Sequence, residues 1–135
     1  MARRMVRIAI YVVGFLLLVL VGMASFLLFV PAVGVYAGSV SPHGRWVALL
    51  ENVQYGLVTG PSDDVVVIRP LNGWFAFMRE KEVFKIDSES SGNRTTLQWQ
   101  SDNVLTIRYP SGIPTPIRID SYGDLRIAYE PQPSP

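Results

Sequence analysis

Hydrophobic and polar positions divide the 135 residues of the chain into two contrasting parts. Residues 8–44 contain no Asp, Glu, Lys or Arg, and within them the run 8–30, IAIYVVGFLLLVLVGMASFLLFV, is almost entirely apolar. An α-helix rises about 1.5 Å per residue, so this run predicts a helix of roughly 35 Å, enough to cross a hydrocarbon core of about 30 Å. From Arg45 onward, charged residues of both signs are interspersed with short apolar runs.

The charges around the apolar run predict its orientation in a membrane. Three arginines lie within residues 1–7, whereas no basic residue follows the run before Arg45. Basic residues beside a membrane helix stay on the cytoplasmic side. Arginine far outnumbers lysine in the chain, which favours a GC-rich bacterial source. We therefore expect residues 1–7 in the cytoplasm, a single crossing of the bacterial inner membrane at 8–30, and an extracytoplasmic, periplasmic location for the rest.

A cleaved signal peptide is the main alternative to a retained membrane helix. Val35, Tyr36 and Ala37 have the small-x-small character of a cleavage site, with the cut after Ala37. Against cleavage, the apolar run is longer than the roughly 7 to 15 residues of a signal-peptide core. A re-entrant or multi-pass arrangement is a further alternative.

Residues 41–129 predict a small all-β domain exported beyond the membrane helix. The corner SPHG at 41–44 contains the Pro and Gly of a turn, and four β-branched residues at 65–68 favour a strand. Six or seven short strands at intervals of about ten residues predict a mainly antiparallel sandwich or a barrel-like sheet. The expected strands include 45–51, 65–68, 96–100, 104–109, 117–119 and 125–129, the last four forming two hairpins.

Three further segments are expected to lie outside the regular strands. Residues 31–40 are small, apolar and glycine-bearing, and we interpret them as a juxtamembrane linker. The stretch SESSGN at 88–93 indicates an exposed loop. The proline-rich tail at 130–135 cannot donate three of its backbone hydrogen bonds and is expected to be flexible.

The segment 74–86 is ambiguous between helix and strand. Trp74, Phe77, Met78 and Phe84 could line one face of a helix. Alternatively, two strands could flank a charged turn at 79–81. We favour strands because aromatic and β-branched residues are dense here and are poor helix formers.

Composition excludes several classes of function. The net charge is +1 and the first seven residues contribute +3, so the remainder is about −2. Nothing in that balance resembles the basic face that neutralises phosphates, so we expect no binding of nucleic acid. The chain has no cysteine, which excludes lipoprotein processing, structural disulfides and thiolate chemistry.

Few residues suggest chemistry. His43 is the sole histidine and lies in a turn; as a general base it would need a nucleophile and an orienting carboxylate, which the sequence does not place. Asp63 and Asp64 form an acidic pair that could bind a hard cation, but the spacing of a calcium loop is absent, and solubilising a strand end is the simpler interpretation. We therefore expect no catalytic residue, no metal site and no cofactor.

The order of these motifs is familiar. The corner at 41–45, the strands VVVIRP and EVFKID, and the pair LQWQSDNVLTIRYP follow one another over about residues 41–110. In this the chain resembles small single-pass membrane-anchored bacterial proteins of unknown function with one exported β-domain. Such proteins usually carry Asp where this chain has His43, and often a cysteine after the first strand. The resemblance implies fold and topology only, and no catalytic residue.

The function expected from these features is that of a binding or assembly module. The chain would contact the lipid bilayer through residues 8–30 and present its β-domain to a protein partner in the cell envelope, whose exposed strands could pair with the sheet edges. The first alternative is a transmembrane sensor or regulator that acts through helix contacts. The second is an enzyme whose site would involve His43 or the acidic pair at 63–64.

Overall fold

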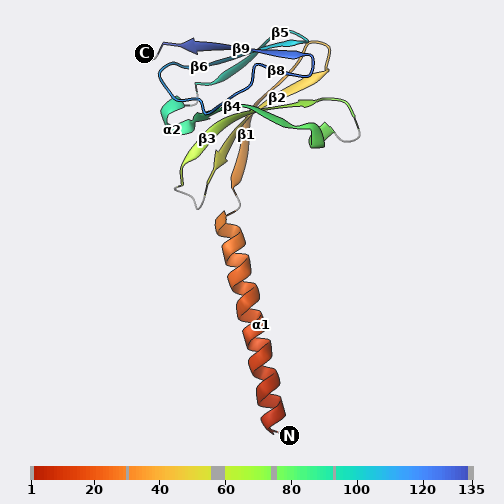
Figure 1. Ribbon diagram of the computed structural model, residues 1–135, viewed down its shortest axis with the longest axis vertical. Helices are drawn as coiled ribbons and strands as arrows, with labels where there is room; N and C mark the ends of the chain where they lie inside the picture. Colours follow the sequence, from red (N-terminus) through yellow and green to blue (C-terminus); the bar gives the residue numbers. More distant parts are fainter. Residues whose placement is uncertain (1, 30, 56–59, 74–75, 93, 134–135) are drawn as a thin grey trace.

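The computed structural model describes residues 2–29, 31–55, 60–73, 76–92 and 94–133, and consists of one long helix followed by two β-sheets (Figure 1). Figure 1 shows the helix leaving the sheets from the end at which the first strand begins. Its elements are α1 (Ala2–Phe29), β1 (Ala32–Val40), β2 (Trp46–Gln54), β3 (Ser62–Pro70), η1 (Ala76–Arg79), β4 (Lys81–Asp87), α2 (Ser88–Ser91), β5 (Thr96–Ser101), β6 (Val104–Pro110), β7 (Ile117–Arg118), β8 (Ser121–Tyr122) and β9 (Leu125–Gln132).

Helix α1 occupies the apolar run and extends past its amino end. It is 28 residues long and ends at Phe29, two residues before Pro31, whose ring cannot continue a helix. Every side chain described in it, from Ile10 to Phe26, is exposed. No helix among the described residues combines the length and the hydropathy that crossing a membrane requires.

The two sheets form the β-sandwich that the strand pattern predicts. The first sheet has five antiparallel strands in the order β1-β2-β3-β4-β7, and the second has four in the order β5-β6-β9-β8. Strands β6 and β9 run parallel, a departure from the mainly antiparallel pattern. The core between the sheets is a single cluster of buried side chains, comprising Ala48, Leu50, Val66, Ile68, Val83, Phe84, Ile86, Leu105, Ile107, Tyr109, Leu125 and Ile127.

The β-branched run in β3 is buried on both faces. Val66 and Ile68 belong to the core cluster, whereas Val65 and Val67 alternate with them and point to the other face of the sheet. Both are nevertheless buried, at 3% and 5% exposure, and the short helix η1 packs against β3. A strand covered on both faces needs apolar residues at successive positions, which explains why the run does not alternate.

The prediction that residues 31–40 form a linker is wrong, because most of them form an edge strand. Residues 32–40 form β1, which pairs with β2 along its whole length, from Ala32 opposite Gln54 to Val40 opposite Val47. Small and β-branched residues suit an extended strand, and the two glycines of the segment do not prevent pairing. The register shifts between Val35 and Ala37, which leaves Tyr36 at a bulge.

The prediction of an exposed loop at 88–93 is also partly wrong, because residues 88–91 form helix α2. Asp87 caps this helix by accepting a hydrogen bond from the backbone N–H of Ser90 at 3.1 Å. Gly92 ends it in the left-handed conformation, with φ of 57°. Ser91, which the polar sequence would place in solvent, is fully buried.

The ambiguous segment at 74–86 divides into two parts. Its second half forms strand β4, as favoured, whereas its first half contains the 3-10 helix η1 in place of a strand. Residues 74 and 75 lie outside the described residues. The short helix covers β3, so tertiary packing prevails over the strand preference of the aromatic side chains.

The carboxyl-terminal part contains one confirmed hairpin and two corrections. Strands β5 and β6 form the predicted hairpin, in which Leu97 is opposite Ile107. The second hairpin exists only between β8 and β9, because residues 117–118 join β4 in the other sheet as β7. The tail expected to be flexible is ordered through Gln132, since β9 continues beside β6. Proline is tolerated there because an extended backbone matches its fixed φ. Residues 134 and 135 lie outside the described part.

Candidate functional site

The corner between β1 and β2 is a tight turn held by its own serine. The backbone N–H of Gly44 donates to the carbonyl oxygen of Ser41 at 2.8 Å, and Gly44 has φ of 71°, which a side chain would disfavour. The hydroxyl of Ser41 accepts from the backbone N–H groups of Arg45 and Trp46, each at 3.1 Å. The predicted turn is therefore confirmed, and the buried Ser41 side chain fixes the direction in which β2 leaves it.

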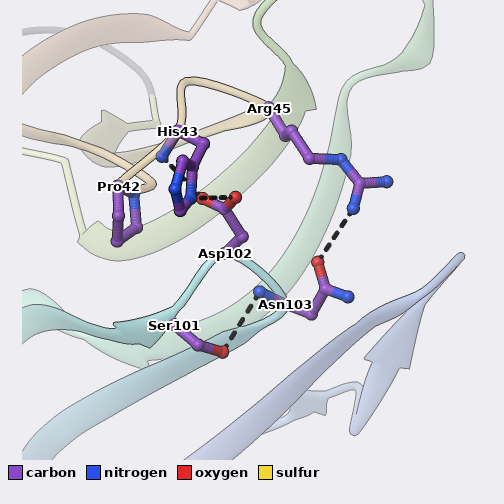
Figure 2. A pocket seen from close by; sticks show the side chains of 6 residues that line it. All are labelled: Pro42, His43, Arg45, Ser101, Asp102 and Asn103. Carbon is purple, nitrogen blue, oxygen red and sulfur yellow. Dashed lines mark hydrogen bonds and ion pairs between the residues drawn. The ribbon is translucent and has the colours of Figure 1, made fainter.

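This corner meets the β5–β6 turn at an open pocket of about 410 Å³, which we call the rim pocket. Figure 1 places the corner at the end of the sandwich opposite α1, and Figure 2 shows the side chains that face the opening. Two segments almost sixty residues apart build the pocket, one from each sheet. Its lining residues are Pro42, His43, Arg45, Ser101, Asp102 and Asn103.

Asp102 holds His43 through two contacts. One carboxyl oxygen, Oδ1, accepts from the backbone N–H of His43 at 2.7 Å, and Oδ2 lies 2.6 Å from Nδ1 of the imidazole (Figure 2). The backbone N–H, followed by the imidazole, keeps the pKa of Asp102 below its usual range. Because Nδ1 faces the carboxylate, the neutral ring has Nε2 as its available acceptor. The imidazole is 82% exposed, so that atom can meet a partner from solvent.

Arg45 crosses the other side of the rim pocket and joins three turns. Its Nη1 donates to Oδ1 of Asn103 at 3.1 Å, and its Nη2 lies 2.7 Å from Oδ2 of Asp124 in the β8–β9 turn. Both charged side chains are about half exposed, so water screens their attraction. The guanidinium is thereby held in one orientation while part of it remains open to solvent.

The rim pocket has part of the arrangement of a hydrolytic site. His43 has an orienting carboxylate, which the sequence could not place. Among the described residues, however, no hydrogen bond joins His43 to a serine or threonine that could act as a nucleophile, and the hydroxyl of Ser41 is engaged with the backbone. No group of three or more metal-ligating side chains lies within the described ranges either. The arrangement suits recognition of a polar partner by Nε2 of His43 and the guanidinium of Arg45.

The acidic pair in β3 divides between two environments. Asp63 lies 2.7 Å from Nζ of Lys85, and this contact raises the pKa of Lys85. Asp64 is fully buried and accepts from the hydroxyls of Tyr36 at 2.5 Å and Ser91 at 2.6 Å, and from the amide of Asn52 at 3.3 Å. The two carboxyl groups face opposite sides of the sheet and do not form a cation site. The interpretation as a solubilised strand end fits Asp63 and is wrong for Asp64.

Sequence reasoning missed most of the partners at both places. Asp102 and Asn103 had a signal, since they occupy a predicted turn, but nothing in the sequence brings that turn to His43. The sequence suggests Tyr36 as part of a cleavage site or as a residue at the level of the membrane headgroups, whereas its hydroxyl donates to Asp64 on the third strand. Burial and the contact with Asp64 raise the pKa of Tyr36.

Comparison with known protein families, curated proteins and solved structures finds no match to this chain. The resemblance to small membrane-anchored bacterial proteins therefore stays a prediction.

Proposed function

We propose that the chain is a single-pass protein of the bacterial inner membrane that presents its β-sandwich on the extracytoplasmic side. The rim pocket then binds a protein partner in the cell envelope. The observation that carries this proposal is the apolar surface of α1, which no other part of the chain that the structure describes covers at residues 10–26. Large apolar side chains are exposed all around it, including Phe15 at 68%, Leu18 at 72% and Phe26 at 68%.

An apolar helix surface of this kind needs a cover. Soluble proteins rarely expose contiguous apolar patches beyond a few hundred Å², and a helix that is hydrophobic all round is typical of a protein core or a membrane. Lipid is the cover that the sequence favours, because the apolar run 8–30 extends past both ends of the described side chains at 10–26. The arginines within residues 1–7 favour a cytoplasmic amino end.

The pairing of β1 supports a retained helix over a cleaved signal peptide. A cut after Ala37 would remove the residues from Ala32 to Val35 that pair with β2, and Ala37 itself pairs with Leu50. The cut would also remove Tyr36, whose hydroxyl is a partner of the buried Asp64. These contacts of β1 are kept only if the chain is not cut after Ala37, which favours a retained α1.

The position of the rim pocket supports a partner-binding role. The β1–β2 corner that lines the pocket lies at the end of the sandwich away from α1 (Figure 1), where a membrane-attached domain would be accessible to other envelope proteins. His43 and Arg45 are held by carboxylates and still present polar atoms to solvent. The guanidinium of Arg45 can donate to a carbonyl or carboxylate oxygen of the partner, and Nε2 of His43 can accept from an N–H or O–H of the partner. Because both side chains are already held in place, binding costs little side-chain entropy.

Site-specific photocrosslinking in living cells tests this function. A photoreactive amino acid replaces Ser101 in the rim pocket, and the matched control replaces Glu89, an exposed residue on α2. We expect a discrete protein adduct from position 101, its loss when Arg45→Ala is added, and no such adduct from position 89. Equal labelling from both positions, or none from position 101, contradicts partner binding at the rim pocket. Extraction of the protein by alkaline carbonate contradicts the membrane helix.

A further inference from the structure

The connection between α1 and the sandwich is very short. Helix α1 ends at Phe29 and β1 begins at Ala32, so only residues 30 and 31 separate them. An extended chain covers at most about 3.6 Å per residue, which keeps Ala32 within about 11 Å of Phe29. If α1 crosses a membrane, as proposed above, the first residues of β1 must lie at the membrane surface.

The end of the first sheet beside α1 carries an exposed apolar face, which we call the proximal face. It consists of Val33, Val35, Val53 and Tyr55. Val33 and Val35 are 55% and 57% exposed and alternate onto the same side of β1. Val53 is opposite Val33, and Tyr55, 41% exposed, follows the residue opposite Ala32. Edge strands in soluble proteins usually carry charges that prevent association, but β1 has none.

Asp63 and Lys85, two of the charged groups near the proximal face, neutralise each other, and a third, Glu51, lies opposite Val35 at the outer end of the face, where burial raises its pKa. Asp63, at the same end of β3, lies 2.7 Å from Nζ of Lys85, which also donates to the hydroxyl of Tyr55 at 3.0 Å. The same ammonium lies 5.0 Å from the centre of the Tyr55 ring. Helix α2, with its exposed acidic residue Glu89, lies farther from α1 than the ends of β1, β2 and β3 (Figure 1). This end of the sheet therefore approaches a membrane without an unpaired charge from Asp63 or Lys85.

We propose that the proximal face is a lipid-contact surface and lies within the headgroup layer of the membrane that holds α1. This inference rests on the proposed membrane helix. The headgroup layer extends about 5 to 8 Å beyond each side of the hydrocarbon core. With Ala32, the first residue of β1, at the hydrocarbon boundary and the strand along the membrane normal, a rise of about 3.3 Å per residue places Val33 about 3 Å out and inside the layer. The same rise places Val35 about 10 Å out, just past the outer boundary of the layer, and Val40 about 26 Å out. Tyrosine is enriched at this depth, and Tyr55 combines an apolar ring with a polar hydroxyl, as residues of the interface do.

The absence of cysteine allows a direct depth measurement on the full chain. Single variants Val33→Cys, Val35→Cys and Val40→Cys receive an environment-sensitive fluorophore and are reconstituted into vesicles of phosphatidylethanolamine and phosphatidylglycerol. Val40 is the matched control, because it is a valine of the same strand and is 50% exposed. We expect iodide in the water to quench the label at position 33 about threefold less than the label at position 40, with position 35 between them. Nitroxide-labelled lipid should give the opposite order.

A fourth label separates this inference from the membrane helix itself. Leu18→Cys lies in the middle of α1 and is expected to be inaccessible to iodide. If position 18 is protected but positions 33 and 40 are quenched equally, the lipid-contact surface is refuted and the membrane helix stands. If position 18 is also quenched by iodide, both proposals fail. Protection of positions 18 and 33, with position 40 open, supports both.

Discussion

Replacing Asp64 is expected to destabilise the sandwich far more than replacing its neighbour Asp63. The carboxyl group of Asp64 is fully buried and joins side chains from three other elements: Tyr36 of β1, Asn52 of β2 and Ser91 of α2. Asp64→Ala removes the common acceptor of all three. Asp63 is the matched control, since it is the same residue type on the same strand and makes a partly exposed ion pair with Lys85.

The contacts of Asp64 set the expected magnitude. A hydrogen bond contributes about 0.5 to 1.5 kcal/mol net, and leaving a buried group unpaired costs about 1 to 3 kcal/mol. Tyr36 and Asn52 are partly exposed and can turn to water, and Ser91 can still donate to the carbonyl oxygen of Ser88 at 3.1 Å. The sum for Asp64→Ala is therefore about 3 kcal/mol, and about half of that for Asp64→Asn, which keeps one acceptor. Asp63→Ala should cost less than about 1 kcal/mol, as surface pairs do.

Urea unfolding of the full chain in detergent micelles, followed by tryptophan fluorescence, measures these differences. With a slope of about 1 kcal/mol per molar urea, the midpoint should fall by about 3 M for Asp64→Ala and by less than about 1 M for Asp63→Ala. Tyr36→Phe should lower it by about 1 M, and its effect should shrink when Asp64 is already Ala, because the two side chains share one contact. Equal shifts for Asp63→Ala and Asp64→Ala would refute the role assigned to the buried carboxyl group.

Three further predictions concern other parts of the sandwich. Burial raises the pKa of Tyr129 to about 12, above the ordinary value near 10, so its contribution to stability is complete below pH 10 and is lost as pH rises to 12. Tyr129→Phe should therefore reduce the fall of the urea midpoint between pH 10 and pH 12, and a fall as steep as that of the unmodified protein would contradict this role. In His43→Ala the pKa of Asp102 should stay below its usual range, because the largest cause is a backbone N–H that the substitution retains; an NMR titration that returns the ordinary value would refute this. Deleting the chain from Pro131 onward should lower the melting temperature by an amount equivalent to about 1 to 2 kcal/mol, since it shortens β9 beside β6, whereas a flexible tail predicts no change.

The sequence predicts those features that depend on local pattern. The β5–β6 hairpin follows from alternation around a short polar turn, and the two strands pair as predicted. The corner at 41–44 follows from Pro and Gly chemistry and forms the expected turn. The all-β character of residues beyond the helix follows from the spacing of turns. Each of these involves residues within about twenty positions of one another.

The errors concern residues whose structure depends on distant neighbours. Residues 32–40 look like a linker because they lack alternation, yet they become an edge strand because β2 offers a partner. Residues 117–118 resemble half of a hairpin, but β4 has a free edge and takes them into the other sheet. The backbone of 130–132 is ordered by β6 in the same way. Pairing of this kind compensates for weak local preference, and a single sequence does not reveal which edges are free.

The rim pocket and the acidic pair illustrate the same limit for functional residues. Asp63 and Asp64 are adjacent, yet successive side chains of a strand point to opposite faces, so one meets Lys85 near the surface and the other meets Ser91 in the interior. Which of the two is buried depends on where α2 packs, and α2 was expected to be a loop. His43 likewise gains its partner only because the sandwich brings the β5–β6 turn beside the β1–β2 corner. Residue type therefore indicates which chemistry is available, whereas the topology of the two sheets decides which side chains can act together.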